Sequence, residues 1–144
     1  MKRMPSKSSS MRMMMASPMT ISTPAPVRSP ENELADIRDV FGLEGTSSVL
    51  AEITGTPTKT LHRAAGGIKI RPRTHIEIVA DFAREVRDMM FQDPTWTDER
   101  RRAMRRWLDI GEIEFDGKVY APREVLADEK LARRALIQLR SQLG

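Results

Sequence analysis

The chain contains no cysteine and only two histidines. Without cysteine it can form neither a disulfide nor a thiolate metal site, and a cysteine nucleophile is excluded. The two histidines, His62 and His75, are too few for a histidine-rich metal site. No apolar run reaches the roughly 18 to 20 residues that a membrane-spanning helix needs, so we expect a soluble protein. With 144 residues, of which 40% are hydrophobic, the chain can form one modest core with an appendage.

Acidic residues are also missing from two stretches of the chain. The first 30 residues hold five of the 24 Lys and Arg residues and no Asp or Glu, so the remainder is close to neutral. Residues 53–76 again contain no acid. A positive segment within a neutral body is typical of a surface that binds a polyanion, because a carboxylate there would repel phosphate. The cations of this segment are Lys59, Arg63, Lys69, Arg71 and Arg73.

Residues 1–29 are rich in Met, Ser and Pro and show no sustained periodicity. Such a segment cannot bury enough apolar surface to offset the entropy of ordering, so we predict a disordered tail. Two other interpretations stay open. The acid-free start, with its Ser and Arg residues, is also typical of a targeting peptide. The repeated methionines also allow the true start to lie farther along, for example at Met19.

Turn and capping residues after this tail predict three short helices in fewer than forty residues. The first begins at Pro30, behind a capping serine, and ends at Gly42. The second begins at residues 46–48 and ends at Gly55, and the third runs from Pro57 to Ala65. Two helices joined by so short a turn need a small residue at their contact and a residue that tolerates positive φ in the turn. Ala51 and Gly55 meet these needs, which predicts a helix-turn-helix.

The segment LAEITGTPTKTLHRAAGG, residues 50–67, resembles the helix-turn-helix of bacterial and phage repressors of the lac repressor and Xre types. That pattern runs as aliphatic-Ala-Glu-x-x-Gly-x-Ser-x-x-Thr-aliphatic-x-Arg. Thr54 departs from it where an apolar residue or Ala is usual, and Thr56-Pro57 replaces the usual Val-Ser. The matching residues are Leu50, Ala51, Glu52, Gly55, Thr60, Leu61 and Arg63.

The resemblance implies that the third helix enters the major groove of double-stranded DNA and reads base edges with its early outward residues. The residues expected to read bases are Thr58, Lys59, His62 and Arg63. Hydroxyls at the start of the preceding helix and cations in the following loop are expected to bind phosphates. These are Ser47, Ser48, Lys69, Arg71 and Arg73. The same spacing also occurs in ordinary helical hairpins with a solvated basic face, and the missing acids favour DNA.

A longer helix is predicted from Pro72 to about residue 92, with Ile76, Val79, Ala83, Val86 and Met90 on its apolar face and Phe82 and Met89 beside them. His75, in its first turn, is interpreted as a solvated or capping residue. Another helix should begin at Thr97 and turn Ala103, Met104, Trp107 and Leu108 inward. Its arginines, residues 100–106, are interpreted as an ordinary charged face, with a second phosphate contact as the alternative.

Residues 111–122 predict a β-hairpin, because Asp116-Gly117 stands between alternating residues. A three-residue loop would place Phe115 and Val119 on one face, whereas a two-residue turn would place them on opposite faces. A short helix from Pro122 to Leu126 and a last amphipathic helix should follow. The residues of that last helix expected to face inward are Leu131, Ala135, Leu136, Leu139 and Leu143.

The layout of this second half weakly resembles antitoxins of the Xre/MbcA/ParS class, whose C-terminal helical domain engages a toxin protein. A phage or mobile-element repressor that dimerises through the same half is the other interpretation. Catalysis is not indicated, because Gly66-Gly67 is a lone pair and no Ser, His or Asp is positioned as a nucleophile with its base. We therefore predict a protein that is not an enzyme and needs no cofactor or metal.

The sequence predicts a mainly α fold: a helix-turn-helix bundle of about five to six helices with one short hairpin and a disordered N-terminal tail. We expect a tail at 1–29, a DNA-binding domain at 30–92 and a helical C-terminal region at 93–144 for dimerisation or partner binding. The expected function is that of a cytoplasmic, sequence-specific transcriptional regulator. A homodimer is expected because one helix reads too few base pairs for genomic specificity.

Overall fold

A computed structural model describes residues 28–44, 47–93 and 95–143. Most of the predicted tail, residues 1–27, and Thr46 lie outside these described residues. The mainly α class with one short hairpin is confirmed, and the helices of the described part number seven. The elements are α1 (Pro30–Phe41), α2 (Ser48–Thr54), α3 (Thr58–Ala65), α4 (Thr74–Met90), α5 (Asp98–Ile110), β1 (Ile113–Phe115), β2 (Lys118–Tyr120), α6 (Pro122–Ala127) and α7 (Glu129–Leu143).

The predicted boundaries of the first two helices are confirmed by their caps. Ser29 Oγ accepts a hydrogen bond from the Asn32 amide, and Pro30 takes the first helical position of α1. Gly42 ends this helix in the left-handed conformation, with φ at 61°. Ser47 caps α2 with its Oγ, which accepts a hydrogen bond from the Val49 amide. Serine at the start and glycine at the end thus define the short helices.

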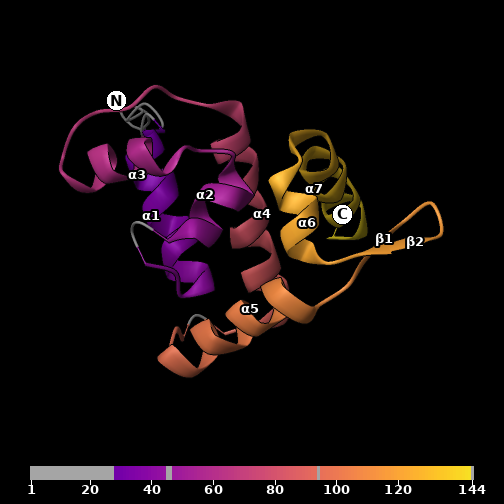
Figure 1. Cartoon of the computed structure of the whole chain (residues 1–144). Coiled ribbons are helices and arrows are strands. Elements are labelled where there is room, and N and C mark those ends of the chain that lie inside the picture. The colour runs from indigo at the N-terminus through magenta and orange to yellow at the C-terminus, as the bar shows by residue number, and fades with distance from the viewer. Residues whose placement is uncertain (1–27, 45–46, 94, 144) are drawn as a thin grey trace, which may run out of the picture.

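Helix α4 lies between the two halves of the fold (Figure 1). Helices α1 and α2 pack on one side of it, and α7 packs on the other. The buried apolar residues of both halves belong to one cluster, which runs from Leu34 and Phe41 through Val79 to Leu126 and Leu139. Within the described part of the chain, no helix is both long enough and apolar enough to cross a membrane.

Three predictions about α4 were wrong in detail. The helix begins at Thr74 and not at Pro72, because Arg73 still has an extended backbone with φ at −136°. His75 is neither solvated nor a cap: it is only 8% exposed and belongs to the buried face. Met89 and Met90, in the last turn of α4, are 45% and 39% exposed, so neither belongs to the buried face.

The C-terminal half contains the predicted helices and a hairpin with a two-residue turn. Thr97 caps α5, and Met104 and Leu108 are fully buried beneath it. Phe115 pairs with Lys118 across Asp116-Gly117, and both turn residues have positive φ. This register places Phe115 inward and leaves Val119 on the opposite face, 59% exposed. The two-residue alternative is therefore correct, and Phe115 and Val119 do not share a face.

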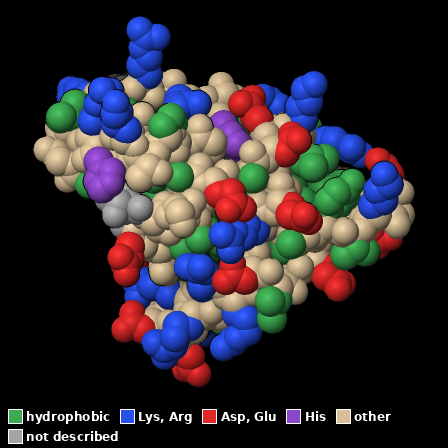
Figure 2. Space-filling model, in the orientation of Figure 1, with side chains coloured by type: hydrophobic (Ala, Val, Ile, Leu, Met, Phe, Trp, Pro, Cys, Tyr) green, Lys and Arg blue, Asp and Glu red, His purple; other side chains and the backbone are tan. Residues whose placement is uncertain are grey.

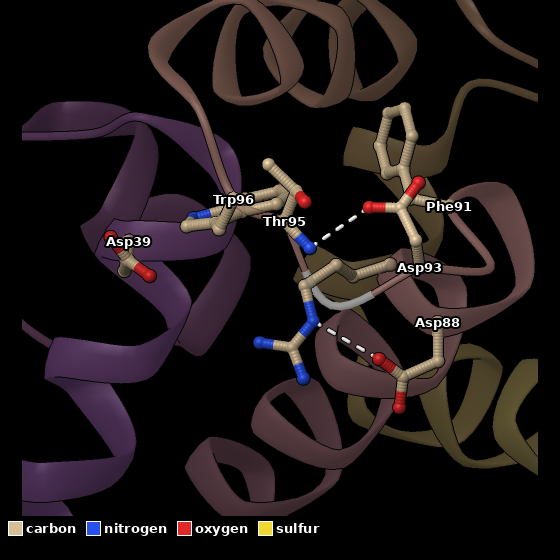
Figure 3. Close-up of a pocket in the computed structure, with 7 residues that line it drawn as sticks. Asp39, Asp88, Phe91, Asp93, Thr95 and Trp96 are labelled. Atoms are coloured by element: carbon tan, nitrogen blue, oxygen red, sulfur yellow. Dashed lines mark hydrogen bonds and ion pairs between the residues drawn. The ribbon is translucent and has the colours of Figure 1, made fainter.

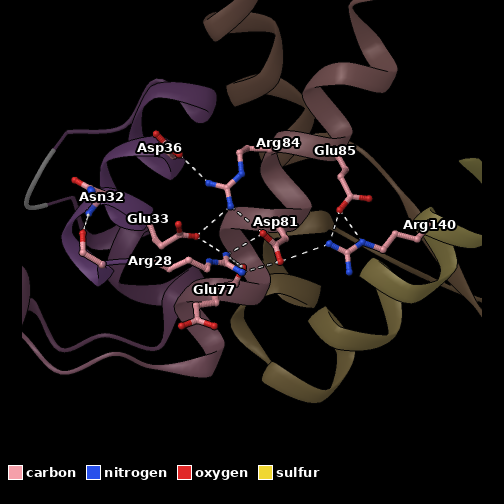
Figure 4. Close-up of polar contacts among 10 residues, drawn as sticks. Arg28, Asn32, Glu33, Asp36, Glu77, Asp81, Arg84, Glu85 and Arg140 are labelled. Atoms are coloured by element: carbon pink, nitrogen blue, oxygen red, sulfur yellow. Dashed lines mark hydrogen bonds and ion pairs between the residues drawn. The ribbon is translucent and has the colours of Figure 1, made fainter. Parts of the chain in front are cut away.

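Ion pairs connect α1, α4 and α7 (Figure 4). The guanidinium groups of Arg28 and Arg84 both bind the carboxylate of Glu33, whose side chain is only 8% exposed, and both bind Asp81. Arg140 of α7 lies 3.5 Å from the same Asp81. The hydrogen bond with Glu33, together with the nearby Asp81, raises the pKa of Arg28 above its ordinary value. Arg28 and Ser29 therefore belong to the fold, although the predicted tail included them.

Candidate nucleic-acid interface

The turn between α2 and α3 is built on Gly55. Its φ of 62° is left-handed, and the amide of Thr56 then bonds to the carbonyl of Ala51 at 3.1 Å. Thr54, the first departure from the repressor pattern, is fully buried, and its hydroxyl donates to the Leu50 carbonyl at 2.6 Å. Thr56 is buried in the place where the pattern has Val, and its hydroxyl lies 2.9 Å from that of Thr54. Both hydroxyls are thus satisfied inside the turn.

Pro57 precedes the first helical residue, so α3 begins at Thr58 and not at the proline as predicted. The Pro57 carbonyl still serves the helix, because it accepts hydrogen bonds from the amides of Thr60 and Leu61. No side chain caps this end of α3. The Thr-Pro pair therefore begins the helix through its backbone, where the repressor pattern uses a serine side chain.

His75 holds this turn against the rest of the fold. A Cβ added to Gly55 would lie 2.8 Å from Nδ1 of His75, so the backbone of the turn touches the imidazole ring directly. The other ring nitrogen, Nε2, lies 2.6 Å from the carbonyl of Leu126 in α6 and must donate to it, since a carbonyl only accepts. The sequence interpretation missed this role. The spacing of residues 75, 79, 82 and 86 on one stripe of α4 was the signal that could have revealed it.

Helix α3 has one buried and one exposed side. Leu61 is 1% exposed and faces the core, with Thr60 and Ala64 half-buried beside it. The four predicted base-reading residues lie on the other side, and all are exposed. They are Thr58, Lys59, His62 and Arg63. The prediction that α3 presents these side chains outward is confirmed.

The loop from Gly66 to Arg73, here called the cation loop, passes around the outer side of α3 before α4 begins (Figure 1). Together with α3 it encloses a hollow of about 390 Å³. The exposed side chains of three predicted phosphate ligands, Lys69, Arg71 and Arg73, line this hollow with Arg63. The exposed side of α3 and the cation loop thus form a continuous basic surface.

These cations differ from most other arginines of the fold, because they are not neutralised. Among the residues that the structure describes, no carboxylate lies within ion-pair distance of Lys59, Arg63, Lys69, Arg71 or Arg73. Figure 2 shows Lys, Arg and His side chains over α3 and the cation loop, with no acidic side chain among them. The arginines that do form ion pairs are Arg28, Arg84, Arg87, Arg100, Arg101, Arg105, Arg123, Arg133, Arg134 and Arg140.

Two acidic residues near this surface already have hydrogen-bond partners for their carboxylates. The carboxylate of Glu31 in α1 accepts a hydrogen bond of 2.8 Å from the Ile70 amide, and it thereby fixes the middle of the cation loop. Glu52 on α2 binds Arg123 of α6 through both carboxylate oxygens, at 3.1 and 3.2 Å. A hydrogen-bonded or paired carboxylate repels a phosphate less than a free one.

The two serines before α2 are used differently. Ser47 is half-buried, and its Oγ accepts from the Val49 amide at 3.1 Å, so its oxygen already caps the helix. Its hydroxyl hydrogen can still be donated to a phosphate oxygen. Ser48 is exposed at the first position of α2. Of the two, Ser48 is therefore the more accessible to a ligand.

The arginine-rich segment of α5 is mostly neutralised. Arg100 binds Asp93, Arg101 binds Asp39, and Arg105 binds Asp109, all at 2.8 to 3.0 Å. The geometry therefore favours the ordinary charged face over a second phosphate contact. Arg102 and Arg106 of this segment are exposed, and neither pairs with a carboxylate of the described residues.

A second hollow, of about 370 Å³, lies between α1, the end of α4 and the loop before α5 (Figure 3). Trp96 lines it, and the guanidinium carbons of Arg87 and Arg101 are 5.9 and 5.7 Å from the centroid of its ring. The hydrogen bond from Arg100 holds the pKa of Asp93 well below its ordinary value. The charged groups of this hollow are already paired, Arg87 with Asp88 and the two other carboxylates with arginines of α5, so it is a weaker candidate than the surface of α3.

Comparison of the chain with models of known protein families, with curated proteins and with solved structures finds no match. The residues and geometry of the α2–α3 unit and the cation loop therefore provide the basis for a functional proposal.

Proposed function

We propose that the protein is a sequence-specific, DNA-binding transcriptional regulator that reads the major groove with α3. The observation that carries the proposal is the exposed side of this helix: Lys59, His62 and Arg63 face outward next to a cation loop without ion pairs in the described chain. Unneutralised cations gain more from phosphate than paired ones, because no internal salt bridge has to be broken.

The two parts of this surface have different roles in the proposal. Arg63 can donate two hydrogen bonds to the O6 and N7 atoms of a guanine, which is worth about 1–3 kcal/mol of discrimination against other bases. Lys69, Arg71 and Arg73 bind phosphates and add affinity without sequence information. The protein acts in the cytoplasm as a homodimer, whose two copies of α3 meet half-sites about 10 base pairs apart.

Selection of bound fragments from a random DNA duplex pool, at two salt concentrations, tests the proposal. The wild-type chain should enrich a motif of two related half-sites. Arg63→Ala should relax the base preference at one position of each half-site. Lys69→Ala should weaken binding to all duplexes and reduce the slope of log K against log salt by about 0.9 for each protomer.

Arg102→Ala is the matched control, because Arg102 is exposed on α5 and pairs with no carboxylate of the described residues. It should change neither the motif nor the slope by a comparable amount. A wild-type chain that binds no duplex in dilute buffer would refute the proposal. Equal effects of Arg63→Ala and Lys69→Ala on base preference would refute the division of roles.

A further inference from the structure

A third hollow, of about 500 Å³, lies between the hairpin, α4 and α7, on the side of α4 away from α3 (Figure 1). We call it the hairpin groove. Phe82, Val86 and Leu139 are buried at its base, and Met89, Trp107 and Ile113 are partly exposed in its walls. The hairpin is fixed over α7, because Arg134 binds Asp116 at 2.8 Å and Gln138 donates to the Glu114 carbonyl. The groove thus has an apolar base and partly polar walls, and these contacts hold the hairpin in place over α7.

The rim of the hairpin groove is acidic. Glu112 and Glu114 line it, both are exposed, and neither is paired with a cation of the described residues. The only other carboxylate of the lining, Asp116, is already bound to Arg134. An occupant that matches this groove is therefore apolar and carries positive charge.

The N-terminal segment of the chain has this chemistry. Residues 1–27 contain no acid and four cations, and methionines are clustered at 11 and 13–15, on both sides of Arg12. Methionine is flexible and polarizable, so it fills irregular apolar surfaces well. DNA phosphates would bind the cations of this segment but make no contact with its methionines, whereas the groove offers acids for the cations and apolar side chains for the methionines. The composition therefore favours the groove over the duplex as its binding site.

The chain enters the fold close enough for this contact. Arg28 is bound to Asp81 of α4 at 2.9 Å, and the next residue, Phe82, already belongs to the base of the groove. Arg28 follows Met15 by 13 positions, and a flexible polypeptide of that length has a root-mean-square end-to-end distance of about 20 Å. Passing around a helix about 10–12 Å in diameter lies within that reach.

From the apolar base, the free acids of the rim and the position of Arg28, we propose that residues 11–15 of the same chain bind in the hairpin groove. The methionine side chains pack against Met89 and Trp107, and Arg12 faces Glu112 and Glu114. The inference does not depend on DNA binding, so its test needs no duplex.

Paramagnetic broadening measures this contact in the full chain. The protein has no cysteine, so a nitroxide on Gln142→Cys, at the groove, is the only label. The ¹³C-methyl signals of Met11, Met13, Met14 and Met15 should lose more than half of their intensity. A nitroxide on Thr58→Cys, on the exposed side of α3, is the matched control and should leave most of that intensity. Equal broadening from both labels would overturn the inference.

Three further samples separate the alternatives. Met14→Ser with Met15→Ser changes only the segment, so the fold is kept, and the Met11 and Met13 signals should recover. Charge reversal by Glu112→Lys with Glu114→Lys should restore the four signals as well. A mixture of ¹³C-methyl protein without nitroxide and nitroxide-bearing protein without ¹³C tests whether the segment binds to a second copy of the chain. Binding within one chain predicts no broadening in that mixture, so broadening that persists there would overturn the proposal and assign the groove to dimerisation. Signals that do not respond to either pair of substitutions would also contradict the proposal.

Discussion

Replacing Gly55 by alanine tests whether His75 fixes the turn of the helix-turn-helix. Two costs are expected. A left-handed φ of 62° costs an L-residue about 1–2 kcal/mol. The new Cβ would also lie 2.8 Å from Nδ1 of His75, so the buried imidazole must move, and its hydrogen bond to Leu126, worth about 0.5–1.5 kcal/mol, is weakened. We therefore expect Gly55→Ala to lower the free energy of unfolding by about 2–3 kcal/mol.

Gly67→Ala and Gly117→Ala are matched controls for the first cost alone. Both glycines have positive φ, at 86° and 80°, and a Cβ at either would meet nothing within 4 Å. Each of these two variants should have a free energy of unfolding about 1–2 kcal/mol lower than that of the wild type. The lower entropy of the unfolded chain with alanine is common to all three variants, so it cancels in the comparison.

Urea unfolding followed by tryptophan fluorescence and circular dichroism gives the free energies. In a His75→Ala background the clash is absent, so the cost of Gly55→Ala should fall to that of Gly67→Ala. If Gly55→Ala and Gly67→Ala cost the same in the wild-type background, the contact between the turn and His75 has no energetic effect and the reasoning fails. The reasoning would also fail if Gly55→Ala lowered the free energy of unfolding by the same amount in the His75→Ala background as in the wild type.

Three more predictions concern the turn and the surface charges. Thr54→Val should lower the free energy of unfolding by about 1 kcal/mol, because it leaves the Thr56 hydroxyl without its 2.9 Å partner. The double change of Thr54→Val with Thr56→Val should lower it by less than the sum of the two single changes, as measured by urea unfolding. The lowered pKa of Asp93 stabilises the fold above the ordinary pKa of 3.8, and this contribution is lost as pH falls below it. Asp93→Asn should therefore be less stable than wild type at pH 6, with a difference that narrows below pH 4 in acid titrations. Arg100→Gln should show the same pH dependence; a difference that stays constant with pH would contradict the pairing.

The local structure of the first half could be predicted because its signals are local. Ser29, Gly42 and Gly55 define helix ends through contacts with residues at most five positions away. The exposed side of α3 also follows from sequence, because the apolar residues Leu61 and Ala64, three positions apart, define the side of the helix that faces the core. The turn of the hairpin stayed open, since Asp116-Gly117 suits both a two-residue and a three-residue loop, and only the register of the paired strands decides between them.

What the sequence could not give depends on distant partners. Glu33 and Arg84 are separated by 51 positions, and Asp39 and Arg101 by 62, so nothing near any of them predicts that they pair. Residues 100–106 could be interpreted from the sequence as an ordinary charged face, and the fold adds the distant Asp39 to the nearby Asp93 and Asp109 as their counterions.

The C-terminal half also determines how α3 is presented. His75 touches the turn at Gly55 and donates to Leu126 of α6, and Glu52 of α2 is bound by Arg123 of the same helix. Helix α6 therefore supports the α2–α3 unit at two points, one buried and one exposed. The exposed pair contributes little to stability, because solvent screens it, but it restricts the rotation of α2 about the buried contact. If α3 reads DNA, its orientation in the groove then depends on α6 as well as on α4, and changes in the second half would alter DNA recognition without touching the duplex.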